Sequence, residues 1–153
     1  MQVAGKLYSG LMLIVKLVSA AILLVLTGAV FTSVIVRYFG LFQGSMPWID
    51  EMARYLSVWL VFLGSATALE QRKHVSADFM VGLVPLRGRP YLNLLIQLSI
   101  LFFLVALTRE GISLSQRTML QSSPALGIPM GYIYMAIPVG GALMILGIVK
   151  SVF

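Results

Sequence analysis

The chain has 153 residues, of which 59% are hydrophobic and only 10% carry a charged side chain. Soluble domains have about 25% charged residues, so this chain has too little charge to cover a water-exposed surface and is expected to lie in a membrane. The absence of cysteine excludes disulfides and thiolate chemistry, and a single histidine, His74, excludes paired-histidine haem ligation. The net charge of +6 is spread over the ends of apolar runs, which does not favour a nucleic-acid partner.

Four apolar stretches are long enough to cross the hydrocarbon core, which takes about 20 helical residues. In chain order, we expect transmembrane helices at about 12–36, 49–70, 91–115 and 128–150, all within a single membrane domain, 1–153. The apolar run Leu17–Val36 is longer than the roughly 7–15 residues of a signal peptide, so we interpret it as a retained helix. The predicted fold class is all-α: an integral membrane four-helix protein with tilted transmembrane helices.

The connections between these helices differ in composition. Residues 37–47 are typical of a turn, whereas residues 70–90 are the most charged part of the chain. Within that second connection, residues 76–86 could form a short interfacial helix or a packed loop. The charge-free part of the third helix ends at Leu107, and we expect a polar connection from about Arg109 to Gly127, with Arg109 and Glu110 following the membrane-embedded part.

The last helix contains a proline and two adjacent glycines. Pro138 is expected to kink the helix or to loosen one backbone hydrogen bond. Gly140 and Gly141 are expected to permit close approach by another helix.

Lysine and arginine residues near the helix ends predict the orientation. Seven lie on one side: Lys6, Lys16, Arg72, Lys73, Arg87, Arg89 and Lys150. Four lie on the other: Arg37, Arg54, Arg109 and Arg117. Because positive charge is enriched in cytoplasmic segments, we expect both termini and the 70–90 loop to be cytoplasmic in a multi-pass protein of the bacterial inner membrane. Interfacial or lipid-facing candidates are Lys16, Arg72, Lys73, Arg87 and Arg89.

The densest polar cluster lies at the start of the second helix. Asp50 and Glu51 complement the positive end of the helix dipole, and both are spaced to reach Arg54. One interpretation is helix capping with an ion pair at the membrane interface; the other is docking of helices or of a partner. The docking candidates are Arg37, Trp48, Asp50, Glu51, Arg54, Trp59 and Gly64.

An acid–base role for Asp50 and Glu51 is disfavoured, because adjacent helical residues point about 100° apart and no nucleophile or metal ligand accompanies them. We assign no catalytic, substrate-binding or metal-ligating residue and expect no cofactor. The pattern places almost no charged residue in the middle of a span, where charge would indicate a transport pathway.

Several motifs follow one another along the chain: Arg37-Tyr38, then a run from Trp48 through Asp50-Glu51, Arg54-Tyr55 and Trp59 to Gly64, then His74-Val75 followed by Asp78. A further motif is Ser123-Pro124-Ala125-Leu126-Gly127-Ile128-Pro129. In these motifs the chain resembles the small membrane (Q-type) subunit of TRAP (tripartite ATP-independent periplasmic) transporters, and residues 123–129 are similar to the last loop of that family.

The resemblance implies a subunit that braces a larger membrane subunit in a sodium-coupled importer of organic anions, of dicarboxylate or sialic-acid type. The large subunit would carry the substrate and sodium sites, and a periplasmic substrate-binding protein would deliver the substrate. Membrane lipids are the other expected partner. Two alternatives remain open at this point: an anchor subunit of a redox or enzyme complex, and a small self-assembling exporter.

Overall fold

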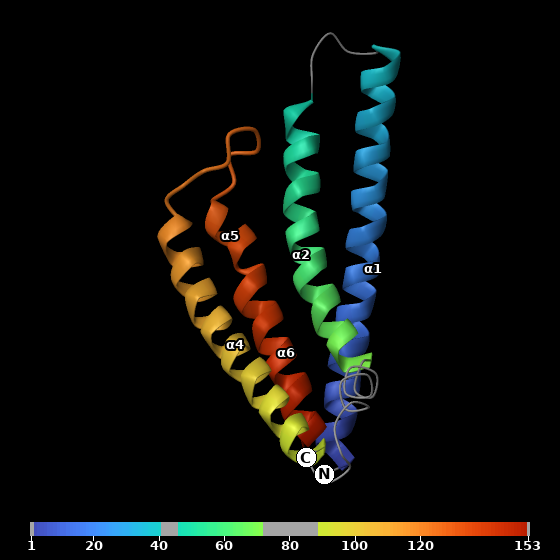
Figure 1. The fold of residues 1–153 in the computed structure, drawn as a ribbon. Helices are drawn as coiled ribbons and strands as arrows, with labels where there is room; N and C mark the ends of the chain where they lie inside the picture. Colours follow the sequence, from blue (N-terminus) through green and yellow to red (C-terminus); the bar gives the residue numbers. More distant parts are fainter. Residues whose placement is uncertain (1, 41–45, 72–88, 153) are drawn as a thin grey trace.

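The computed structural model describes residues 2–40, 46–71 and 89–152. Its helices are α1 (Gln2–Phe39), α2 (Pro47–Gln71), α4 (Arg89–Thr118), α5 (Met130–Tyr134) and α6 (Ala136–Val152), as Figure 1 shows. Four stretches are long and apolar enough to cross a membrane: Tyr8–Phe39, Pro47–Leu69, Leu94–Thr118 and Met130–Lys150. The predicted all-α class with four spans is therefore confirmed, while the suggested helix at 76–86 lies outside the described residues.

Helix α4 ends at Thr118, three residues beyond the expected end of the third span at about 115. The polar connection expected from about Arg109 therefore begins later than that expectation. The extra turns are held by one buried face, formed by Gly111, Ser115 and Thr118, which repeats every three or four residues. The Ser115 hydroxyl also donates to the carbonyl oxygen of Gly131 at 2.8 Å. Polar residues between these positions made the segment look like a loop, although they only occupy the other faces of the helix.

The last span is interrupted, as its proline predicts. Because Pro138 has no N–H, the carbonyl of Tyr134, four residues earlier, loses its helical donor. The hydrogen bonds on either side persist, from the Met135 N–H to the Gly131 oxygen at 3.0 Å and from the Val139 N–H to the Met135 oxygen at 3.2 Å. Helices α5 and α6 are thus two parts of one membrane crossing.

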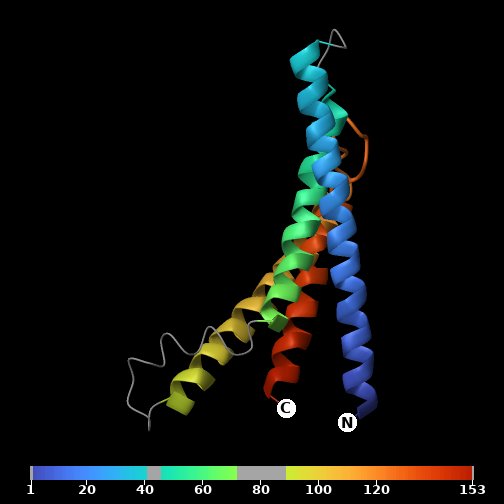
Figure 2. The same cartoon turned by 90° about the vertical axis from the view of Figure 1, so that its right-hand side faces the viewer.

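The helices stand in a row in the order α1, α2, α6, α4 (Figure 1). Helix α6 lies between α2 and α4, whose backbones do not approach each other closely in the described part of the chain. The start of α1 and the end of α6 lie at the same end of the molecule (Figures 1 and 2). Figure 2 also shows α4 inclining away from α6 toward its own N-terminus.

Helix α1 packs against α2 through one regular stripe. Its buried and half-buried positions alternate in steps of three and four residues: Met12, Val15, Ser19, Ile22, Leu26, Ala29, Ser33 and Val36. This is the spacing at which two helices pack at a small crossing angle with interdigitated side chains. The remaining faces of α1 are apolar and exposed, so they contact lipid or another protein.

Glycines in α6 allow it to fit between its neighbours. A β-carbon at Gly140 would stand 2.7 Å from the Cβ of Phe62 in α2, and one at Gly141 would collide with the Thr108 hydroxyl in α4. Below this level, Ala66, Leu104, Met144 and Ile148 from the three helices form the buried core cluster. The close approach expected of Gly140 and Gly141 is therefore present, and it lies within the chain itself.

Candidate functional site

The polar cluster at the start of α2 contains two carboxylates that bind different parts of the chain. Asp50 accepts a hydrogen bond from the Ser33 hydroxyl at 2.9 Å and forms a salt bridge with Arg37 at 3.2 Å. Both partners lie near the end of α1, so Asp50 fastens the end of α1 to the beginning of α2. The Arg37 and Asp50 side chains are 73% and 44% exposed, and such a pair contributes about 0–1 kcal/mol.

Glu51 is buried and binds the connection between α4 and α5. One carboxylate oxygen accepts hydrogen bonds from the backbone N–H groups of Ala125 and Leu126, at 2.8 and 2.9 Å. The other accepts from the Tyr55 hydroxyl, one turn further along α2. Three donors around one carboxylate compensate for the water that it loses on burial.

The bound loop, residues 121–129, has a compact internal structure. The Ser123 N–H donates to the Ile128 oxygen at 2.9 Å, and the Met130 N–H donates to the Gln121 oxygen at 2.8 Å. Gly127 has a φ of +66°, a conformation that side-chain-bearing residues rarely adopt. These contacts set the direction of the chain at 124–126, so that two successive N–H groups point at Glu51.

The structure differs from the sequence pattern at Arg54. We expected Asp50 and Glu51 to reach it along the helix, but they pair instead with α1 and with the 121–129 loop. Asp50 is bound by Ser33 and Arg37 of α1, and Glu51 accepts hydrogen bonds from Tyr55, Ala125 and Leu126. Arg54 is exposed at the outside of α2.

The other candidates are dispersed along the chain. Trp48 is 46% exposed, Trp59 is half-buried, and a β-carbon at Gly64 would find no atom within 4 Å. Gly64 is thus not needed for packing inside this chain, and its role toward a partner stays a prediction. Lys16 is exposed and Arg89 opens α4, while Arg72, Lys73 and Arg87 lie outside the described residues.

This arrangement suits mechanical support better than chemistry. No group of three or more potential metal-ligating side chains occurs in the described ranges. Glu51 and Asp50 are engaged in joining three segments, namely the end of α1, the start of α2 and the 121–129 loop. The sequence showed the two carboxylates and the loop motif, but no spacing rule could pair Glu51 with amides 74 residues away.

A family model and individual relatives of this chain indicate the same protein family. Residues 26–153 match the family model described as "Tripartite ATP-independent periplasmic transporters, DctQ component". The chain is similar to a putative TRAP transporter small permease protein of Haemophilus influenzae, with 26% identity over 90% of this chain and 87% of the relative. It is also 27% identical to the sialic acid TRAP transporter small permease protein SiaQ of Vibrio cholerae, over 69% of this chain and 61% of SiaQ.

A longer relative shows the same segment within a larger protein. The isethionate TRAP transporter permease protein DctMQ of Oleidesulfovibrio alaskensis is 26% identical over 71% of this chain, which covers only 18% of that protein. The family match extends over well more than half of this chain and includes three of its four spans completely. The chain therefore belongs to the DctQ component of the tripartite ATP-independent periplasmic transporters, and it is a multi-pass inner-membrane subunit of a transporter rather than an enzyme.

Proposed function

We propose that this chain braces the large membrane subunit of a sodium-coupled, binding-protein-dependent importer of organic anions. The observation that carries this proposal is the single row of four helices (Figure 1). A row has two broad faces and no interior common to all its helices, so it cannot enclose a substrate by itself. It offers a wide, stiff surface to another membrane protein.

The Glu51 contacts explain how such a brace stays rigid at its outer end. Helices α2 and α4 are not neighbours, yet Glu51 ties the start of α2 to the loop that follows α4. Together with the Asp50 contacts to α1, this links the ends of the row through a buried carboxylate and an exposed one. A brace needs this resistance to shear if its partner moves during transport.

Relatives support a large membrane partner. In DctMQ and in the sialic acid TRAP transporter permease protein SiaT of Haemophilus influenzae, the segment similar to this chain makes up 18% of a longer permease. A joined protein of this kind is expected when two parts work in contact. The periplasmic binding protein and the sodium coupling rest on the family resemblance, with the substrate and sodium sites placed in the large subunit and no cofactor in this one.

The substrate class is an organic anion. Relatives are named for sialic acid and isethionate, both anionic at neutral pH. A dicarboxylate is a further candidate from the family resemblance. Since this chain offers no enclosed site, we place the choice among these anions in the partner subunit and in the binding protein.

We also propose that both termini and the 70–90 loop face the cytoplasm. The start of α1 and the end of α6 lie at one end of the row (Figure 2). Lys150 in the last turn of α6 and Arg89 at the start of α4 lie toward this end, and Lys16 lies in the half of α1 that is nearer to it. The positive-inside rule supports assigning that end to the cytoplasm.

Reconstitution tests the proposal directly. The large subunit, the binding protein and this chain are placed in liposomes, and uptake of radiolabelled sialic acid, isethionate or a dicarboxylate is measured under an inward sodium gradient. We expect uptake of one of these anions only when all three proteins are present. Full uptake without this chain would exclude the bracing role, and equal uptake under a potassium gradient would exclude sodium coupling.

A further inference from the structure

Two adjacent charged residues lie inside the third span. Arg109 and Glu110 belong to α4, and the apolar span that contains them runs from Leu94 to Thr118. The sequence pattern had placed them after the membrane-embedded part. In the structure the helix continues for two more turns, so Arg109 lies about 13 Å along the axis from the end of α4.

Contacts with α6 fix the depth of this pair. Thr108 meets Gly141, and a β-carbon at Gly111 would stand 2.7 Å from the Ile137 Cγ2. Arg109 and Glu110 therefore lie level with residues 137–141, and the span Met130–Lys150 has its middle at residue 140.

Helix α2 gives the same depth independently. Gly140 meets Phe62, which follows Glu51 of the outer polar cluster by 11 residues, or about 17 Å of helix. Half of a hydrocarbon core of about 30 Å is about 15 Å. Both references place the charged pair near the middle of the membrane.

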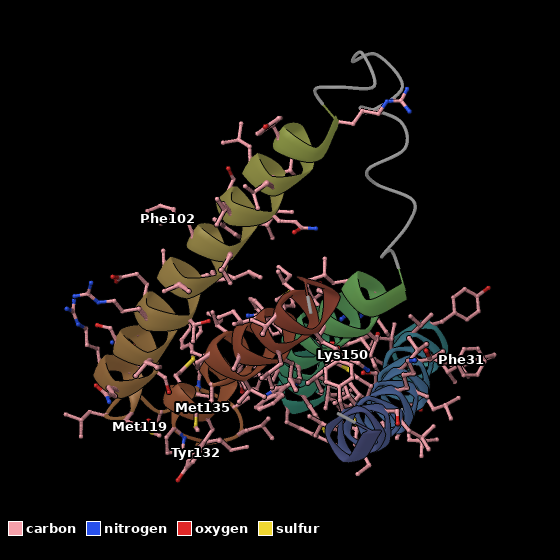
Figure 3. All side chains as sticks on the ribbon, turned by 90° about the horizontal axis from the view of Figure 1, so that it is seen from below. Phe31, Phe102, Met119, Tyr132, Met135 and Lys150 are labelled. Atoms are coloured by element: carbon pink, nitrogen blue, oxygen red, sulfur yellow. The ribbon has the colours of Figure 1, made fainter. Side chains whose placement is uncertain are left out.

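Both charged side chains point away from the row. Thr108 and Gly111 on either side of them face α6, and successive residues of a helix are rotated by about 100°. Arg109 and Glu110 are both exposed. Arg109 continues a stripe on the outside of α4 whose members are again three and four residues apart: Leu95, Ser99, Phe102 and Ala106. Phe102 is 78% exposed and points away from the other helices in Figure 3.

Neither charge is compensated by the described part of the chain. No ion pair or hydrogen bond of Arg109 or Glu110 is present there, and adjacent helical residues do not face each other. Ionisable side chains at mid-membrane depth almost always face protein or water and pair with another group. A lipid-facing position would leave both charges without any partner.

We propose that the outer stripe of α4 (Leu95, Ser99, Phe102, Ala106 and Arg109, with Glu110 beside it) docks on a helix of the large membrane subunit. That helix presents an acidic side chain to Arg109 and a hydrogen-bond donor or a cation to Glu110. The inference rests on the proposed function and assigns the surface for it. A large subunit is favoured over a second copy because DctMQ and SiaT carry this segment within one much longer permease.

Photo-crosslinking tests the surface without disturbing the charges. A benzophenone amino acid replaces Phe102 in the chain co-expressed with its large subunit, and the same probe at Phe31 is the matched control. Phe31 is 66% exposed on α1, at the opposite side of the molecule (Figure 3). We expect irradiation to join the Phe102 variant, and not the Phe31 variant, to the large subunit. Adducts from Phe102 only with lipid, or only with a second copy of this chain, would overturn the docking surface.

Charge reversal tests the ion pair. Arg109→Glu is compared with Arg117→Glu, which changes another exposed arginine, in the last turn of the same helix. We expect Arg109→Glu to lower recovery of the large subunit by roughly tenfold or more, as for the loss of one partner of a buried charge pair. We expect Arg117→Glu to leave recovery unchanged. Normal recovery with both Arg109→Glu and Arg109→Leu would show that Arg109 has no charged partner and would overturn the proposal.

The two proposals can fail separately. If the unmodified chain does not co-purify with the large subunit, the proposed function fails, and this inference fails with it. If the two subunits co-purify and transport, but the Phe102 probe does not reach the large subunit, only the docking surface is wrong.

Discussion

Glu51 in α2 accepts a hydrogen bond of 2.8 Å from the backbone N–H of Ala125, although 74 residues separate them. This contact joins the start of α2 to the loop that connects α4 with α5. Since Glu51 is 7% exposed and its acceptors are filled by groups of the same chain, its contribution is to stability.

Glu51→Ala is expected to lower the free energy of unfolding by about 1–3 kcal/mol, because two backbone N–H groups and a tyrosine hydroxyl lose their acceptor. The measurement is the thermal unfolding midpoint of the purified complex in detergent. Asp50→Ala is the matched control at the next position; its exposed pair with Arg37 predicts a loss below about 1 kcal/mol. An equal loss of unfolding free energy for the two variants would show that the buried Glu51 contributes no more to stability than the exposed Asp50.

Substitution of Gly127 tests the loop that Glu51 binds. Gly127 has a φ of +66°, so Gly127→Ala places a side chain in the left-handed region of backbone conformation. This lowers the free energy of unfolding by about 1–2 kcal/mol. Gly28→Ala in α1 is the control, because a β-carbon there meets no atom within 4 Å and alanine favours the helix. We expect a lower unfolding temperature for Gly127→Ala alone; an unchanged value would mean that the loop can relax.

Packing between α2 and α6 depends on Gly140. Gly140→Leu is expected to destabilise the chain by about 1–3 kcal/mol or more, since even a β-carbon would approach the Phe62 Cβ to 2.7 Å. Fluorescence-detected size-exclusion chromatography after heating is a suitable readout. Gly10→Leu, at an exposed position where a β-carbon meets no atom within 4 Å, serves as control and should elute as the unmodified chain does.

Gly64 offers a way to separate folding from assembly. No atom of the described chain lies within 4 Å of a β-carbon at this position, so Gly64→Leu should leave the unfolding temperature of the isolated chain unchanged. If the face that carries Gly64 contacts a partner helix, the same change should reduce the amount of large subunit that co-purifies. Normal co-purification would remove Gly64 from the docking candidates.

The sequence predicts the helices well because hydropathy is a local property. Each of the four spans is recognisable from about 20 consecutive residues, and Pro138 indicates its own interruption. The end of α4 is harder to predict, because two local patterns disagree there: the length of the span indicates a helix to about 115, whereas Arg109 and Glu110 are typical of a loop. The helix continues to Thr118, where Gly111 packs against Ile137 of α6 and the Ser115 hydroxyl donates to the Gly131 carbonyl of α5.

The candidate site also has a part that local sequence predicts and a part that depends on the fold. That Asp50 and Glu51 belong together at a helix start follows from charge and spacing. Their actual partners depend on which segments the fold brings near. Arg54 was the only cation within reach along the helix, but Arg37 and the amides of the 121–129 loop approach from other segments. Sequence spacing describes one helix at a time and contains no information about such approaches.

The position of α6 has a consequence for how the protein is made. The order of synthesis is α1, α2, α4, α6, whereas the order in the row is α1, α2, α6, α4. Of these four helices, α6 leaves the ribosome last, and it must enter between two helices that have already been made. Within the described residues, the α1–α2 pair and α4 have no close backbone contact with each other unless α6 lies between them. Completion of the row, and of any surface that a partner recognises across it, must therefore wait for α6.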